Sequence, residues 1–187
     1  MKSQIASFLV LLTLGVAAQA DTLKIDPVHS TVGFKIRHMF GNVTGRFTDV
    51  SGTIDVDAAH PENATVQATI GIKSIDTANA MRDNDLRGSN FFEAEKFPTM
   101  TFKSTKVVVN GQQADLTGDL TLHGVTKPIT LKARLIGSGN DPILKAFAVG
   151  FEATGDINRS DFGIKQYLPL VGDDVRLTIA GAFLLQP

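Results

Sequence analysis

Apolar and polar residues alternate with a period of two along most of the chain, which is the pattern of a β-strand with one buried face. In the first such segment, Val32, Phe34 and Ile36 share one face. Seven further segments repeat the alternation, at residues 52–56, 66–72, 100–102, 114–122, 125–135, 147–153 and 175–185. The pattern therefore predicts an all-β fold of eight strands.

The strands are long and closely linked. Several exceed the usual length of about five or six residues, which predicts a tall barrel or sandwich. Asn110-Gly111 and His123-Gly124 are typical of tight hairpin turns, so neighbouring strands should be antiparallel. Phe47 and Val50 have opposite parity within one continuous segment, and this predicts a β-bulge at residues 48–49.

The alternation breaks down between residues 73 and 98, a stretch too long for a simple loop. Asp76 or Thr77 is a suitable cap for a short helix through residues 81–87. We therefore expect a short helical insertion around residues 77–95.

A second irregular stretch spans residues 158–173 and contains Phe162, Ile164, Tyr167 and Leu168. Apolar residues in such a segment have two possible roles. They cover one end of the barrel, which is the favoured interpretation, or they gate a cavity.

The aromatic composition indicates which face of the strands is buried. Barrels of the outer membrane carry girdles rich in Trp and Tyr. This chain has no Trp, one Tyr and twelve Phe, and its last three residues lack a terminal aromatic. We therefore place the apolar face inside the barrel and the polar face in water, with no stable membrane insertion.

The interior of an eight-stranded barrel holds either packed side chains or one slender ligand. Several inward positions carry small residues, which leave space for a ligand or make room for Phe rings on neighbouring strands. Both interpretations stand at this point. The small residues are Gly52, Gly118, Gly181, Ala68, Ala133 and Ala153.

The first twenty residues differ from the rest of the chain. Lys2 precedes an apolar run over residues 5–16, and Ala18-Gln19-Ala20 fits a small-x-small cleavage site. We expect residues 1–20 to be a cleaved signal peptide and residues 21–187 to form one domain. The run is shorter than the roughly 20 residues of a membrane span.

Charge and cysteine content exclude several classes of protein. The 18 basic and 19 acidic residues give a net charge of −1, which favours neither a nucleic-acid partner nor an anionic surface. The absence of Cys excludes disulfides and thiolate chemistry. An exported protein without disulfides is more typical of a bacterial periplasm than of animal secretion.

No pattern in the sequence predicts an enzyme. The four His residues are widely spaced and do not suggest a metal site. Asp26, His29 and Ser30 are the right types for a triad, but three groups within one turn are not expected to adopt its geometry, and Asp26 and Ser30 are expected to bond the backbone instead. The chain has no phosphate loop, dinucleotide fingerprint or nucleophile elbow.

Two charged clusters and one histidine remain as candidates. Arg82 to Arg87 and Arg159 with its acidic neighbours are interpreted as solvated surface pairs. The functional alternative is an arginine that receives a phosphate or carbonyl head group. His38 has the inward parity and is interpreted as a satisfied core residue, with a ligand contact as the alternative.

Taken in order, the motifs of the chain resemble the YceI-like, polyisoprenoid-binding family over nearly all of residues 21–187. They are residues 26–30 (DPVHS), 32–38 (VGFKIRH), 45–47 (GRF), 82–86 (RDNDL), 91–93 (FFE), 97–102 (FPTMTF), 118–128 (GDLTLHGVTKP) and 157–163 (INRSDFG).

The resemblance implies an extended, lipocalin-like, eight-stranded antiparallel barrel in the periplasm. It also implies a non-enzymatic protein that carries or stores an isoprenoid or other long-chain lipid, such as a prenyl phosphate or isoprenoid quinone, with no other cofactor. A homodimer is retained as a candidate assembly. The predicted lipid contacts are Phe34, Ile36, His38, Phe47, Ile54, Phe91, Phe92, Phe102, Leu120, Ile129, Leu131, Phe147 and Phe151.

Overall fold

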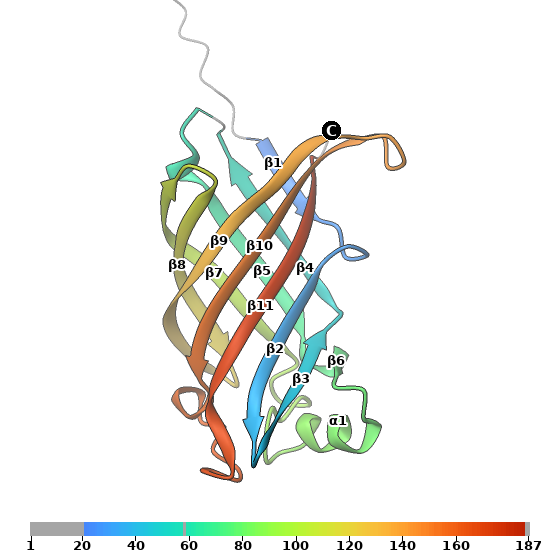
Figure 1. Cartoon of the computed structure of the whole chain (residues 1–187), viewed down its shortest axis with the longest axis vertical. Helices are drawn as coiled ribbons and strands as arrows, with labels where there is room; N and C mark the ends of the chain where they lie inside the picture. The colour runs from blue at the N-terminus through green and yellow to red at the C-terminus, as the bar shows by residue number, and fades with distance from the viewer. Residues whose placement is uncertain (1–20, 58, 186–187) are drawn as a thin grey trace, which may run out of the picture.

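The strands form one antiparallel sheet that closes on itself (Figure 1). The computed structural model describes residues 21–57 and 59–185, so the predicted signal peptide lies outside the described residues. The strands are β1 (Asp21–Ile25), β2 (Thr31–His38), β3 (Gly41–Phe47), β4 (Val50–Val56), β5 (Thr65–Gly71), β6 (Ile75–Asp76), β7 (Thr99–Asn110), β8 (Gln113–Leu122), β9 (Val125–Asp141), β10 (Ala146–Asn158) and β11 (Val171–Leu185). One α-helix, α1 (Ala80–Arg87), and three 3-10 turns at Pro61–Asn63, Ile72–Ser74 and Arg159–Phe162 complete the described elements.

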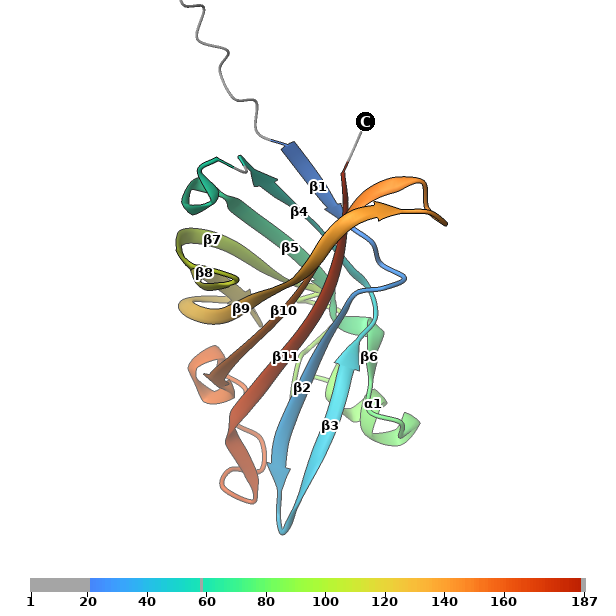
Figure 2. The same cartoon turned by 45° about the horizontal axis from the view of Figure 1, so that its top comes forward.

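Eight strands make the closed barrel. Strand β1 pairs with β4 on one side and with β11 on the other, which completes the ring β1-β4-β5-β7-β8-β9-β10-β11. Strands β2, β3 and β6 extend the sheet from the part of β11 that lies nearer α1. The structure therefore confirms the predicted eight-stranded antiparallel barrel with one short helix (Figures 1 and 2).

The predicted β-bulge at residues 48–49 is wrong, because the chain leaves one strand there and starts another. Strand β3 pairs with β2 and β6, whereas β4 pairs with β1 and β5. The two linking residues bond the 3-10 turn before β6: Thr48 N–H donates to Ser74 Oγ at 3.1 Å, and Asp49 C=O accepts from Gly71 N–H at 2.9 Å. The inward-facing parity changes between Phe47 and Val50 because β3 and β4 belong to different parts of the sheet.

Both predicted hairpin turns are confirmed. Residues 111–112 connect β7 to β8, and residues 123–124 connect β8 to β9. His123 and Gly124 have φ angles of 52° and 74°. Two consecutive positive φ angles are the requirement of a type I′ turn, which matches the twist of the strands that it joins.

Helix α1 lies where residues 81–87 were predicted to be helical, but its cap differs from the prediction. Asn79 is the N-cap, and its side-chain oxygen accepts from Arg82 N–H at 3.0 Å. Thr77 instead bonds Asp83, and Asp76 accepts from Ala78 N–H. Asp76 and Thr77 are equally suitable residue types, but both are engaged in these other hydrogen bonds.

The apolar core has two parts. The larger one lies toward α1 and contains Phe162, Ile72 and Ile75, which are almost completely buried. The smaller one lies at the other end and contains Leu23, Ile54, Val149 and Phe183. None of the helices in the described ranges has the length and apolar character needed to cross a membrane.

Candidate functional site

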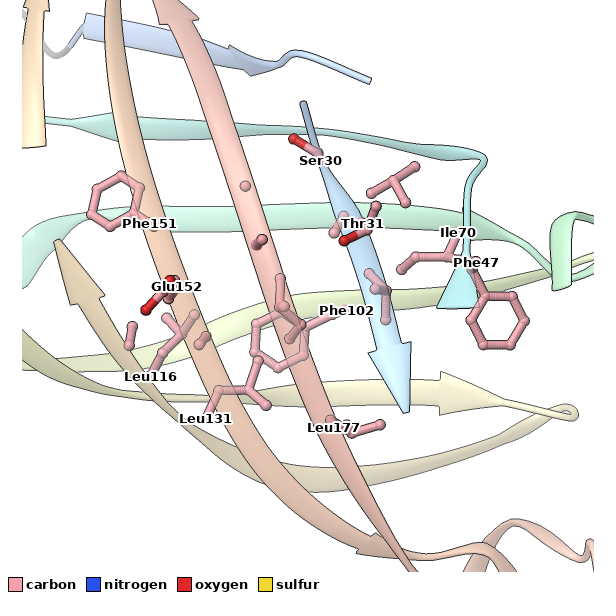
Figure 3. A pocket seen from close by; sticks show the side chains of 18 of the residues that line it. Ser30, Thr31, Phe47, Ile70, Phe102, Leu116, Leu131, Phe151, Glu152 and Leu177 are labelled. Atoms are coloured by element: carbon pink, nitrogen blue, oxygen red, sulfur yellow. The ribbon is translucent and has the colours of Figure 1, made fainter. Parts of the chain in front are cut away.

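A cavity of about 1160 Å³ lies inside the barrel. Every strand except the two-residue β6 contributes side chains to its wall. Figure 3 shows Ile70, Phe102 and Leu131 pointing into this space from three different strands. The question left open by the small inward residues is therefore answered by the structure, because the barrel encloses open volume.

The structure places all thirteen predicted contact residues on the cavity wall. They differ in burial: Phe102, Leu120 and Leu131 are buried, whereas Phe147 is 39% exposed and His38 is exposed. The full set on the wall is Phe34, Ile36, His38, Phe47, Ile54, Phe91, Phe92, Phe102, Leu120, Ile129, Leu131, Phe147 and Phe151.

The small inward residues serve both purposes that were considered. Gly118 makes room for a neighbour, because a β-carbon there would lie 2.5 Å from the Phe102 ring. Gly52 has a φ of 156° and approaches the backbone of Gln67. The remaining four, Gly181, Ala68, Ala133 and Ala153, line the cavity.

Many of the exposed lining residues lie at the two ends of the barrel, whereas Arg134, Glu152 and Ala180 are exposed on three neighbouring strands. Beside α1, at the bottom of Figure 1, the exposed lining residues are His38, Asn79, Met81, Asp85 and Tyr167, and we call this opening the lower mouth. At the other end they are Asp21, Gly111, Gln112, Ser138 and Phe147, which we call the upper mouth. Between the mouths the wall is mostly apolar (Figure 3).

The second irregular stretch both covers the barrel end and borders the cavity. Phe162 is 1% exposed and belongs to the core, and Ile164 is buried on the cavity wall. Tyr167 is exposed at the lower mouth, where its ring lies 6.0 Å from that of Phe91. Leu168 is also exposed. Covering is thus confirmed for the first two residues, whereas the other two stand at the opening.

The interpretation of His38 as a core residue is wrong. Strand β2 continues past the end of the barrel, so its last residue reaches solvent at the lower mouth. Within residues 21–57 and 59–185, the His38 imidazole has no hydrogen-bond or ion-pair partner. A general base is normally oriented by such a partner, and His38 has none among these residues.

The sequence predicted that the charged residues of α1 form solvated surface pairs. This prediction is wrong for two of them. Asp83 is buried and accepts hydrogen bonds from the backbone N–H and the hydroxyl of Thr77. Arg87 donates to the carbonyls of Lys73 and Ile75 at 2.9 and 2.8 Å. These bonds attach the helix to the chain around β6, beside the lower mouth.

Arg159 is likewise buried rather than on the surface. Its guanidinium donates to the carbonyls of Gly172, Ile164 and Val171 at 2.7, 3.1 and 3.0 Å, and its side chain borders the cavity. Burial lowers the pKa of Arg159 from its ordinary value, yet a guanidinium remains charged at neutral pH. The loop at residues 164–172 encloses this cation, and no local pattern in the sequence signals that.

Asp26 and Ser30, near the start of the chain, are confirmed as backbone-bonding residues. Asp26 accepts from Val28 N–H, and Ser30 Oγ bonds both the N–H and the C=O of Ala182. His29 Nδ1 lies 2.6 Å from Asp26, and this bond holds the pKa of the Asp26 carboxyl below its usual range. Ser30 is thus engaged by β11 rather than by His29. No group of three possible metal ligands occurs among the described residues.

Comparison with known proteins agrees with the barrel and its cavity. A UPF0312 protein of Pseudomonas paraeruginosa is 43% identical over 173 residues, which cover 91% of this chain and 90% of the relative. The crystal structure of Campylobacter jejuni YceI is similar with a TM-score of 0.71 and 34% identity, over 81% of this chain and 90% of that one.

A more distant structure shares the fold alone. It is described as a polyisoprenoid binding domain from Saccharophagus degradans, with a TM-score of 0.68 and 16% identity over 89% of this chain and 99% of that one. The family model described as the YceI-like domain matches residues 23–183. This chain therefore belongs to the YceI-like family.

Proposed function

We propose that this protein binds one long-chain lipid of the isoprenoid type in its barrel cavity and carries or stores it in the periplasm. The observation that supports the proposal is the cavity itself: an apolar space of about 1160 Å³ with polar groups at each mouth. An amphiphile with a long chain matches that distribution, because its chain requires apolar walls and its head group requires water.

The size of the cavity suits a long chain better than a small metabolite. Typical pockets for drug-sized ligands have volumes of about 300–1,000 Å³. If each non-hydrogen atom occupies about the 30 Å³ of a liquid water molecule, the space of about 1160 Å³ holds on the order of 40 atoms. A multi-unit prenyl chain has that size.

The isoprenoid class is supported by the structure from Saccharophagus degradans, which is described as polyisoprenoid-binding and has the same fold. The lower mouth offers polar groups suited to a head group. Arg82 borders it and donates to the hydroxyl and carbonyl of Thr77, both at 2.8 Å. A prenyl phosphate or an isoprenoid quinone would present oxygen acceptors to such a cation.

We propose binding rather than catalysis on the chemistry of the wall. The alternative function is an enzyme acting on a lipid or a small carbonyl compound, for which His38 would be the base. His38 is exposed at a mouth, and Asp26, His29 and Ser30 are engaged elsewhere. The remaining wall of the cavity is mostly apolar, so it offers few groups that could transfer a proton or attack a substrate.

The test is to express the whole chain in a bacterium and to recover it from the envelope fraction without detergent. Native mass spectrometry before and after organic extraction should show one bound apolar lipid per chain, which chromatography of the extract identifies. Empty protein that also takes up no prenyl lipid from detergent micelles would overturn the proposal. The same fractionation tests the periplasmic location, and sedimentation tests the homodimer.

A further inference from the structure

Exposed apolar side chains surround the lower mouth. We call them the lower rim, and they come from the β2–β3 hairpin, from α1 and from the loop before β11. Phe40, at the hairpin tip, is fully exposed. The complete set is Met39, Phe40, Met81, Tyr167, Leu168 and Leu170. Figure 1 shows the hairpin and the loop before β11 side by side at the bottom of the barrel, with α1 toward the same end.

Hydrogen bonds join two segments of the lower rim, the β2–β3 hairpin and the loop before β11. Met39 N–H donates to Leu170 C=O at 2.9 Å. The Arg37 guanidinium donates to the carbonyls of Met39 and Pro169 at 3.1 and 2.6 Å. Residues 37–41 and 164–171 are thus held together by hydrogen bonds, and we call them the platform. The exposed side chains of the hairpin and the loop project from it. Exposed apolar patches of this kind mark surfaces that contact a partner or a membrane.

The lower rim continues into the cavity without a polar gap. Met81 and Tyr167 belong to the rim and also line the cavity. Tyr167 contacts Phe91, which lies deeper on the same wall. An apolar molecule could therefore move between the rim and the cavity along a continuous apolar surface.

The charges on the platform have one sign. Residues 37–41 and 164–171 contain Arg37 and Lys165 and no carboxylate. On α1, Arg82 and Asp85 both border the mouth and balance each other. A cationic platform that carries apolar tips is the combination that binds anionic lipid surfaces.

The opposite end of the barrel has apolar tips as well, but no excess of positive charge. Ile143 and Leu144 are exposed on the β9–β10 hairpin. Asp141 and Lys145 in the same hairpin balance each other, and Asp21 borders the upper mouth. Carboxylates at this position would repel an anionic surface. The two ends therefore differ in charge and not in apolar exposure.

We propose that the lower rim docks this protein on an anionic phospholipid bilayer, so that lipid enters and leaves the cavity there without crossing water. The part concerning lipid exchange rests on the proposed function. The docking itself depends only on the six apolar residues of the lower rim and on the cations beside them.

The test is flotation of the purified protein with vesicles of phosphatidylcholine, alone or mixed with phosphatidylglycerol. The mixed vesicles should carry the protein, and added salt should weaken binding. Phe40→Glu should weaken it about tenfold or more, because an apolar contact is lost and a charge is repelled. Lys165→Glu should weaken it about fivefold, since each basic residue near such a surface contributes appreciably.

Matched controls come from the hairpin at the opposite end. Ile143→Glu and Lys145→Glu change an exposed apolar tip and an exposed cation in the same way, and binding should not change. Failure of the wild type to float, or an equal loss in the upper variants, overturns the docking proposal. A Phe40→Glu variant that only dissociates a dimer in sedimentation would show that the rim contacts a second copy instead.

A separate measurement keeps this proposal distinct from the proposed function. Phe40→Glu protein should take up a prenyl lipid from detergent micelles as well as the wild type does, because its cavity is unchanged. It should exchange that lipid with anionic vesicles more slowly. Wild-type protein that floats with anionic vesicles but never takes up a prenyl lipid refutes the proposed function and leaves the docking proposal intact. Wild-type protein that takes up the lipid but never floats with the vesicles refutes docking and leaves the proposed function intact.

Discussion

Ala133 lies directly opposite Ala153 in the pairing of β9 with β10, and both residues line the cavity. On its other side Ala133 is opposite Ala114 of β8, which also lines the cavity. Three adjacent strands thus present only methyl groups at this height. Side-chain volume controls the space inside a small barrel, so this row of alanines widens the cavity locally.

Filling this row should reduce lipid binding. Ala133→Phe would place an aromatic ring inside the cavity, and we expect the amount of lipid recovered per chain to fall several-fold. The matched control is Lys132→Phe, which adds the same ring to the neighbouring, exposed position. Equal lipid recovery from the two variants, measured by native mass spectrometry, would contradict a role for this part of the cavity.

Gly118 tests how tightly the wall is packed. A β-carbon at this position would lie 2.5 Å from both the Phe102 ring and the backbone oxygen of Lys103. Gly118→Ala should therefore cost about 1–3 kcal/mol of unfolding free energy, as overpacking does.

The control for Gly118 is Gly137→Ala, because an added β-carbon there meets nothing within 4 Å. That substitution should leave stability unchanged or raise it slightly. Urea denaturation of both variants gives the comparison. If Gly118→Ala leaves the free energy of unfolding unchanged, the Phe102 ring must be free to move into the cavity.

Strand parity was sufficient to predict much of the fold and the cavity wall. Residues such as Phe34, Phe102 and Leu131 alternate with polar neighbours, and this local signal reports directly which face is inside. The division of the sheet between β3 and β4 was missed, because the change of parity there resembles that of a bulge. What distinguishes the two is the pairing partner, which lies far away in the sequence.

The charged residues show where local patterns fail. Arg159 and Asp83 look like surface residues in the sequence, and both are buried: Thr77, just before α1, donates to Asp83, and Arg159 donates to the carbonyls of Ile164 and Gly172. Asn79 was passed over as the cap because Asp76 and Thr77 are equally suitable types. These positions are decided by how the irregular segments fold and which hydrogen bonds they make, whereas the alternation of the strands can be read from neighbours in the chain.

Arg159 should be important for stability. Its side chain bonds three carbonyls of the loop at residues 164–172, and Arg159→Met would leave these acceptors without the guanidinium. Because hydrogen bonds to a buried charge are strong, we expect a loss of roughly 3 kcal/mol of unfolding free energy.

Arg134→Met is the control for Arg159, since Arg134 forms an exposed pair with Glu152 at 2.8 Å. Exposed pairs contribute little to stability. Denaturant titration of the two variants should separate them clearly. Comparable losses would mean that the buried guanidinium is no more important than a surface charge.

Asp173 should make the lower end of the barrel sensitive to acid. The hydrogen bond from the Ser160 hydroxyl, at 2.7 Å, is the main cause that lowers the pKa of the Asp173 carboxyl, and Ser160 N–H adds a second bond at 2.9 Å. A carboxyl whose pKa is lower in the folded state stabilises the fold above its unfolded value of about 3.9. That contribution is lost as the pH falls below this value, through the lower folded pKa.

Ser160→Ala removes the hydroxyl bond and brings the pKa of Asp173 nearer to its unfolded value. The variant should be less stable at neutral pH by roughly 1 kcal/mol, and it should lose less of its remaining stability than the wild type between pH 5 and pH 3. Ser51→Ala, whose hydroxyl donates only to the carbonyl of Thr69, should follow the wild-type pH profile. If all three proteins lose stability in parallel on acidification, Asp173 does not control the acid response, and other carboxyls such as Asp26 would have to account for it.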